Sequence, residues 1–127
     1  MREQGYVYQS LVLCHKDCFD NNTIKKFKNL KDTDGNPIVL NKGLLNPPYS
    51  QKDHVELEFL EQELDLICQG GEVAVVCPMS CAIGTKFKDV RERLMTKHTL
   101  KAVFSMPDDI FYGQGAGTCV CVMVWEA

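Results

Sequence analysis

The stretch "NPPYS" at residues 46–50 combines residue types that suit a binding or catalytic site. Two consecutive prolines fix their own φ angles and donate no backbone hydrogen bond, and they hold the residue before them in an extended conformation. The Asn46 amide and the Tyr49 ring therefore flank a stiff segment that follows a short apolar run. A loop at the carboxyl end of a central parallel strand is where open α/β sheets bind ligands. A rigid turn with a surface tyrosine is the alternative explanation.

Strand and helix signals alternate around this stretch. Apolar and β-branched runs predict strands at residues 7–14, within 38–45, and at 72–78, 100–107 and 118–127. Apolar residues at helical spacing predict helices at residues 21–31, 53–69 and 85–98, the first with an Asn or Thr cap.

This order of elements predicts an α/β fold around a mostly parallel sheet. The continuous apolar run at residues 72–78 is typical of a strand buried on both faces. The connection between the last two strands is too short for a helical crossover, so we expect that pair to be antiparallel.

The composition is that of a globular domain, with 45% hydrophobic residues, 24% charged residues and a formal net charge of −3. That charge argues against strong non-specific binding of nucleic acid, although it allows binding in a cleft. No apolar run approaches the roughly 18 residues of a membrane helix. The apolar run at residues 10–14 is also too short for the core of a signal peptide. We therefore expect a cytoplasmic protein without a membrane partner.

The chain has seven cysteines, and their number and spacing indicate their state. They are Cys14, Cys18, Cys68, Cys77, Cys81, Cys119 and Cys121. The odd number, without a targeting segment, favours reduced thiols. The spacings differ from the Cys-x-x-Cys pairs of zinc sites, so no metal is expected. Cys77, Cys119 and Cys121 lie in apolar runs and are expected to act as small hydrophobic residues.

The glycine-rich stretch "FYGQGAGT" at residues 111–118 resembles a nucleotide-binding loop. A phosphate loop of that kind opens a helix whose N-terminus faces the ligand. Here the β-branched run "CVCVMVW" follows instead, and it predicts a strand. We therefore interpret the stretch as a hairpin connection and not as a cofactor motif.

The stretch at residues 46–50, on its strand–loop–helix layout, resembles the catalytic motif of S-adenosylmethionine-dependent amino methyltransferases, of which the N6-adenine DNA methyltransferases are the best known. "GGEVAVVCPMSCAIG" resembles their next strand, and "VLCHKDCFD" resembles the element that precedes the motif. "LKAVFSMPDDIFYGQGAGTCVCVMVWEA" is similar to the antiparallel hairpin of type I restriction-system modification subunits. The resemblance covers the chain from about residue 6 to its end, and it implies a partial Rossmann-like methyltransferase fold.

The resemblance also implies a role for each residue of the motif. The exocyclic amine of adenine is a poor nucleophile, and hydrogen-bond acceptors aimed at it would stabilise the charge that develops on its nitrogen. Asn46 would provide one acceptor and the Pro47 carbonyl the other, with Pro48 keeping the segment stiff. Tyr49 would stack on a base flipped out of the DNA helix. S-adenosylmethionine would be the cofactor, in contact with Asp17 and Asn46.

One departure from the family concerns the cofactor site. The family builds that site mainly from a glycine motif and an acidic residue that precede "VLCHKDCFD", and this sequence has neither at that place. We therefore expect residues 1–127 to be a single partial domain, the C-terminal half of a catalytic domain, and to be inactive alone. Residues 1–20 would lack their family neighbours and are predicted to pair in another way, for example across a homodimer.

The resemblance implies DNA as substrate, and specificity and restriction subunits as partners within a restriction-modification system. Two alternatives stay open at this point. One is a non-catalytic piece that serves assembly or DNA binding. The other is a methyltransferase for protein glutamine or RNA amino groups, because such enzymes share the motif.

Overall fold

The computed structural model describes residues 17–49, 55–107 and 119–127. In chain order its elements are α1 (Asn21–Lys28), β1 (Lys42–Leu45), α2 (Glu56–Leu66), β2 (Glu72–Pro78), α3 (Ser80–Ile83), the 3₁₀ turn η2 (Thr85–Phe87), α4 (Lys88–Lys97), β3 (Thr99–Ser105) and β4 (Val120–Glu126). Within these described ranges, no helix is long and apolar enough to cross a membrane. The predicted α/β class is confirmed, while the predicted strand at residues 7–14 lies outside the described residues.

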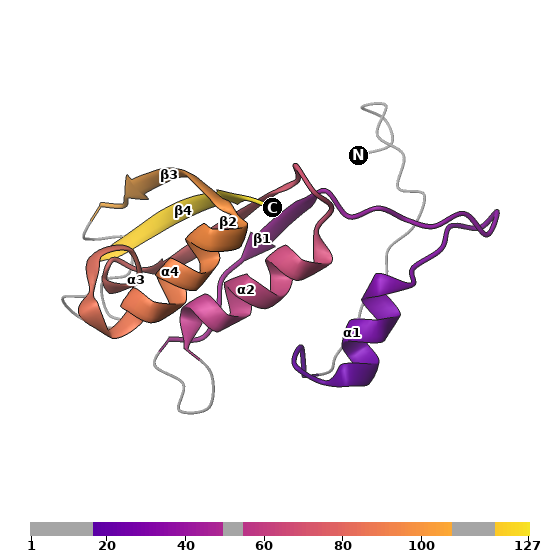
Figure 1. Cartoon of the computed structure of the whole chain (residues 1–127), viewed down its shortest axis with the longest axis horizontal. Helices are drawn as coiled ribbons and strands as arrows, with labels where there is room; N and C mark the ends of the chain where they lie inside the picture. Colours follow the sequence, from indigo (N-terminus) through magenta and orange to yellow (C-terminus); the bar gives the residue numbers. More distant parts are fainter. Residues whose placement is uncertain (1–16, 50–54, 108–118) are drawn as a thin grey trace.

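A four-stranded sheet in the order β1-β2-β4-β3 forms the centre of the molecule (Figure 1). β1 and β2 are parallel, with Leu44 opposite Ala74. β4 pairs antiparallel with β2 on one side and with β3 on the other. The predicted antiparallel pairing of the last two strands is therefore confirmed. The prediction of a mostly parallel sheet is wrong, because β4 inserts between β2 and β3 and leaves β1–β2 as the one parallel pair among the described strands.

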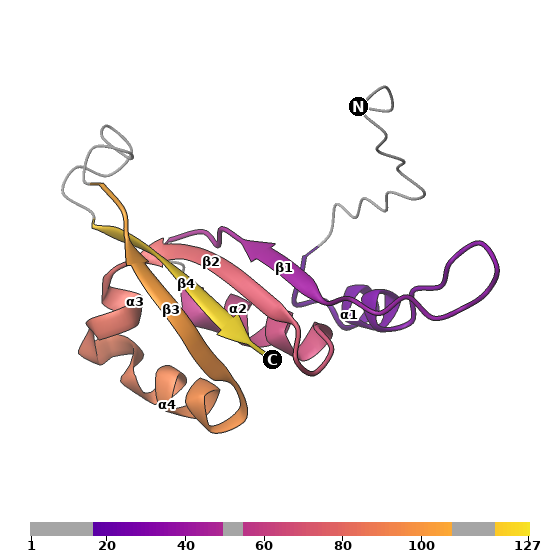
Figure 2. The ribbon, with the colours of Figure 1, turned by 90° about the horizontal axis from the view of Figure 1, so that it is seen from above.

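Helices α2, α3 and α4 cover one face of this sheet, as the two perpendicular views show (Figures 1 and 2). Alternate residues of β2 and β4 point toward that face, because side chains alternate along a strand. Those residues are fully buried, and they are Val73, Val75, Cys77, Cys121, Met123 and Trp125. They pack against buried leucines of α2, which are Leu57, Leu60 and Leu64.

The opposite face of the sheet is less covered. Ala74 and Val76 of β2 and Val122 and Val124 of β4 are only half-buried there. Among the elements of the described ranges, none lies over this face in Figure 2. The prediction that residues 72–78 are buried on both faces is therefore wrong for the described part of the chain, where burial is one-sided.

The ends of the helices follow local signals. Asp20 caps α1, since its carboxylate accepts a hydrogen bond from the Thr23 backbone N–H at 3.2 Å. The expected Asn or Thr cap is thus replaced by the residue just before. α2 ends at Leu66 because Ile67 is extended, and Gly70 then turns the chain at a φ of 85°, a conformation that favours glycine.

We expect Leu60→Ala in α2 to lower the free energy of unfolding by about 2–5 kcal/mol, because it leaves a cavity in a packed core. Leu60 is fully buried, whereas Leu44 of β1 is 80% exposed. The matched substitution Leu44→Ala should change the stability by no more than about 0.5 kcal/mol. Urea denaturation of both variants measures the difference, and equal losses would contradict this assignment of the core.

Candidate active site

Asn46 follows β1 directly, at the end of the sheet where the parallel strands β1 and β2 both have their carboxyl ends. Its side chain is exposed. Within the described part of the chain, the Asn46 amide makes no hydrogen bond that would occupy it. Among the described residues, its oxygen is therefore unoccupied and open to a hydrogen-bond donor.

The two prolines after Asn46 have opposite environments. Pro47 is buried and Pro48 is exposed. Burial of one ring on a segment with two fixed φ angles holds the backbone at Asn46 in place. No N–H of the described residues donates to the Pro47 carbonyl outside regular secondary structure, so this second predicted acceptor is also unoccupied in that part of the protein.

Tyr49 is half-buried, and its hydroxyl group points inward. That hydroxyl is fully buried without a hydrogen-bond partner among the described residues. Burial, together with the nearby thiols of Cys77, Cys81 and Cys121, raises the pKa of Tyr49. The hydroxyl end of the Tyr49 side chain is thus buried against the core, and the solvent-exposed surface of Tyr49 belongs to its other atoms.

The thiols near Tyr49 form a packed cluster where β2 ends and β4 begins. The Sγ atoms of Cys77 and Cys121 lie 3.8 Å apart, and Cys77 Sγ lies 3.7 Å from Met123 Sδ. A hydrogen bond with Cys81 and burial both raise the pKa of Cys77. Protonated, buried thiols act as small hydrophobic groups, as predicted for Cys77 and Cys121. Cys119 is exposed, so the same prediction is wrong for it.

No group of three potential metal ligands exists in the described ranges. The six cysteines of those ranges are free thiols.

Asp17, the predicted cofactor ligand, lies in the exposed turn before α1. Its Oδ1 accepts a hydrogen bond from the Phe19 backbone N–H at 2.9 Å, and its carbonyl accepts one from Asp20. The turn is fixed to α2, because the Cys18 carbonyl accepts a hydrogen bond from Gln62 and the Phe19 ring meets Phe59 edge-on at 4.8 Å.

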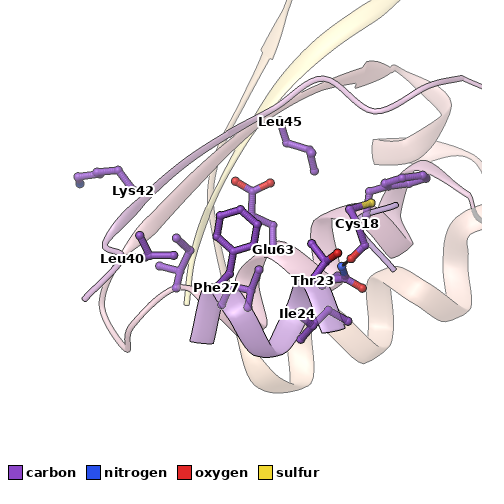
Figure 3. Close-up of a pocket in the computed structure, with 12 residues that line it drawn as sticks. Cys18, Thr23, Ile24, Phe27, Leu40, Lys42, Leu45 and Glu63 are labelled. Carbon is purple, nitrogen blue, oxygen red and sulfur yellow. Dashed lines mark hydrogen bonds between the residues drawn. The ribbon is translucent and has the colours of Figure 1, made fainter. Parts of the chain in front are cut away.

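The two predicted cofactor residues do not line a common cavity themselves, but a sequence neighbour of each one does. Cys18, next to Asp17, and Leu45, next to Asn46, both line a cavity of about 240 Å³ between α1, α2 and β1. Figure 3 shows lining side chains from these three elements and from the segments next to them, such as Cys18 and Leu40. No hydrogen bond joins Asp17 to Asn46 in the part of the chain that the structure describes. The fold therefore brings their segments together without direct contact.

Glu63 of α2 is the residue in this cavity that the sequence analysis missed. Its carboxylate lies among apolar side chains such as Phe27 and Leu45 (Figure 3), and burial raises its pKa. A Cβ on Gly43 would clash with the Glu63 carboxylate and lie 3.1 Å from Val73 Cγ2. A glycine inside a strand often marks such a close approach, so Gly43 was the signal available in the sequence.

Comparison with known proteins gives a matching family and a relative. The family model of N-6 DNA Methylase matches residues 25–126. The chain is 33% identical over 95 residues to the type II restriction enzyme and methyltransferase RM.BcgI of Heyndrickxia coagulans, covering 68% of this chain and 15% of that protein. The chain therefore spans less than a fifth of the length of this relative.

Solved structures show the same fold. The M protein of the type I restriction enzyme EcoKI superposes with a TM-score of 0.57 at 25% identity, covering 74% of this chain and 22% of that one. The complex of M1.HpyAVI with SAM gives a TM-score of 0.53 at 20% identity, covering 89% of this chain and 51% of that one.

Glu63→Gln should stabilise the protein more at neutral pH than at acidic pH. The pKa of Glu63 in the folded state is raised above the ordinary value of 4.5. Between the ordinary pKa and the raised pKa, the folded state therefore binds more protons than the unfolded state. Stability is lost as the pH rises through that window, and the glutamine variant lacks this loss. Thermal unfolding of both proteins between pH 3 and pH 8 measures the difference.

Glu61→Gln is the matched control, with the opposite sign. A hydrogen bond from Arg93, with Nε at 2.6 Å from Oε2, lowers the pKa of Glu61. Its contribution is present above the ordinary pKa and is lost as the pH falls through the folded-state pKa. This variant should therefore lose stability at neutral pH and approach the wild type in acid. The same pH trend in both variants would contradict the assigned environment of Glu63.

Proposed function

The chain belongs to the N-6 DNA methylase family, and from that premise we propose that it is part of an enzyme that methylates the N6 amino group of adenine in DNA within a restriction-modification system. The observation that carries this proposal is the state of Asn46. Its amide is exposed and unoccupied within the described residues, at the carboxyl end of a parallel strand. The buried Pro47 ring holds it there.

The proposed chemistry uses two acceptors from this loop. The Asn46 oxygen and the Pro47 carbonyl accept hydrogen bonds from the two N–H groups of the adenine amine. Both acceptors favour the positive charge that develops on nitrogen as its new bond to carbon forms and the bond from that carbon to the donor sulfur breaks, and the nitrogen then releases one proton to water. Because the backbone is already stiff, the acceptors need little reorganisation during the reaction. No carboxylate or histidine is required in this step.

The proposed cofactor is S-adenosylmethionine, and the described residues fit one side of it. Oδ1 of Asp17 accepts a hydrogen bond within its own turn, and Cys18 and Leu45, the neighbours of Asp17 and Asn46, line the same cavity. These two residues would hold the group from one side. When bound, S-adenosylmethionine supplies a methyl group on a positively charged sulfur. The remaining contacts must come from other strands, so we expect residues 1–127 to be inactive alone.

Tyr49 would complete the substrate site. A flipped base is usually held by stacking on an aromatic side chain. The inward position of the hydroxyl fixes the orientation of the Tyr49 ring, which limits the freedom that stacking would otherwise remove.

DNA and the specificity and restriction subunits are the proposed partners, and free thiols fit the reducing cytoplasm. A non-catalytic role in assembly is the second candidate. It is favoured by the sheet edge at β1, which has no neighbouring strand in the described ranges.

Asn46→Ala should lower methyl transfer by at least about a hundredfold in the active enzyme that contains this chain, since it removes one acceptor of the transition state. N6-methyladenine in a DNA substrate is measured by mass spectrometry. Asn22→Ala in α1, an exposed residue away from the loop, is the control and should keep full activity. Retained activity in Asn46→Ala would refute the assigned role, while methylation of RNA or protein in place of DNA would refute the substrate.

Calorimetric titration of S-adenosylmethionine into residues 1–127 tests the cofactor side separately. We expect no measurable binding, because one side of a site leaves most of the ligand in water. Micromolar binding would contradict the half-site, and Asp17→Ala would then show whether that carboxylate contributes.

Tyr49→Phe should keep both methyl transfer and thermal stability, because it retains the ring and removes a buried hydroxyl that has no partner among the described residues. Tyr49→Ala should lose methyl transfer, because it removes the stacking surface. Loss of activity in Tyr49→Phe would show that the hydroxyl itself takes part.

A further inference from the structure

The four-residue helix α3 (Ser80–Ile83) lies at the same end of the sheet as the loop that carries Tyr49. β1 and β2 are parallel, so the loop after Leu45 and the helix after Pro78 both follow the carboxyl ends of these strands. Isolated helices shorter than about 12–15 residues are marginal in water. α3 therefore depends on contacts with the rest of the protein to keep its position.

The Arg91 guanidinium of α4 supplies one such contact. Its Nη1 donates a hydrogen bond to the Cys81 carbonyl at 3.0 Å, in a partly buried position. A helix of four residues leaves carbonyl groups without a partner inside the helix. A cationic donor at the C-terminal end satisfies such a carbonyl and interacts favourably with the helix dipole. Arg91 therefore joins α3 to α4, which lies next to it in Figure 1.

The Cys81 side chain connects this hydrogen bond to Tyr49. The Cys81 thiol is fully buried and is hydrogen-bonded to the Cys77 thiol. Both thiols lie near enough to the Tyr49 hydroxyl to affect its ionisation, and that hydroxyl is itself fully buried. Groups in a close-packed interior have little room to move independently. α3 therefore supplies part of the buried wall around the Tyr49 hydroxyl.

We propose that Arg91 is a positioning residue for the target base: its hydrogen bond to the Cys81 carbonyl holds α3 against the Tyr49 hydroxyl and so keeps the Tyr49 ring in the orientation that stacks on adenine. The inference rests on the proposed stacking role of Tyr49. Arg91 acts through Cys81 and does not touch the substrate. Without the guanidinium, α3 loses a fixed point and the ring gains freedom, which stacking must then remove at a cost in affinity.

Chemical nitration of the 127-residue chain tests the link between Arg91 and Tyr49 without any measurement of activity. Tetranitromethane nitrates a tyrosine ring beside its hydroxyl, so a buried hydroxyl reacts slowly. Mass spectrometry of peptides measures the rate at Tyr49 separately from the rates at the other tyrosines. Arg91→Met keeps an apolar stem and removes every donor, and it should speed nitration of Tyr49 by at least about fivefold. Arg91→Lys keeps a cationic donor and should stay within about twofold of the wild type.

Arg93→Met is the matched control on the same helix. Arg93 Nε lies 2.6 Å from Glu61 Oε2 of α2, so this variant loses an ion pair of α4 and leaves the Cys81 carbonyl bonded. It should not speed nitration of Tyr49. Cys81→Ala acts on the same link from its other end and should speed nitration as Arg91→Met does. Circular dichroism checks the folding of each variant, and Cys81→Ala decides the result if Arg91→Met does not fold.

DNA affinity of the active enzyme that contains this chain tests the consequence for the substrate. Arg91→Met should weaken binding of target DNA by about tenfold in fluorescence anisotropy, because stacking of the flipped base is impaired. Affinity for S-adenosylmethionine should stay within about twofold, since neither Arg91 nor Cys81 lines the cavity between α1, α2 and β1. In a Tyr49→Ala background, Arg91→Met should weaken DNA binding by less than about twofold, because the two residues act as a unit.

Three results would overturn the proposal. Equal nitration of Tyr49 in the wild type and in Arg91→Met would show that the ring does not depend on Arg91. Equal acceleration by Arg93→Met would show a general loss of stability. Additive losses of DNA affinity in the double variant would show that Arg91 acts by another route than Tyr49.

Failure of the proposed function gives a different pattern. Unchanged DNA affinity and methyl transfer in Tyr49→Ala would refute the stacking role itself. Faster nitration of Tyr49 in Arg91→Met would then still show the structural link, so the two failures are distinguishable.

Discussion

The antiparallel pairing of β2 with β4 is the interaction on which the rest of the structure depends. The two strands are in register from Glu72 opposite Glu126 to Pro78 opposite Val120. Their alternate residues form the buried layer beneath α2, with Trp125 and Met123 at its centre. β1 and β3 are added on either side of this pair. The position of Asn46 therefore depends on β2, because β1 pairs with β2 in a parallel register and Asn46 directly follows β1.

The candidate active site depends on the same layer. The loop after β1 has one part in the core and one part in solvent, since Pro47 is buried while Asn46 is exposed. The Tyr49 hydroxyl adds a second fixed point above the thiols of Cys77 and Cys121. These two anchored groups, on either side of Pro48, hold the backbone that follows Asn46. A stiff backbone of this kind suits the hydrogen-bond acceptors that we propose for this loop, since preorganised acceptors need little rearrangement during a reaction.

One-sided burial explains why the described part of the chain has an open edge and a partly exposed sheet face. The helices α2, α3 and α4 lie on the same side (Figure 1). The other side holds half-buried alanine and valine residues, whereas the cavity lies on the helix side, between α1, α2 and β1. Glu63 is the exception in this apolar surrounding, and its carboxylate has space only because Gly43 has no side chain. The candidate active site and the open edge of the described sheet thus meet at β1.

The sequence by itself determined the order of the main helices and strands in the described ranges, the antiparallel final strands, and the family of the chain. These depend on periodicity, loop length and a short motif, all of which are local in the chain. The placement of β4 between β2 and β3, the inward Tyr49 hydroxyl, and the approach of Glu63 to Gly43 were decided only by the tertiary structure. Each brings together residues far apart in sequence, such as Tyr49 and Cys121, and no local pattern encodes which distant partners share a buried space. For the same reason, the run at residues 72–78 predicted burial on two faces, although packing covers only one in the described protein.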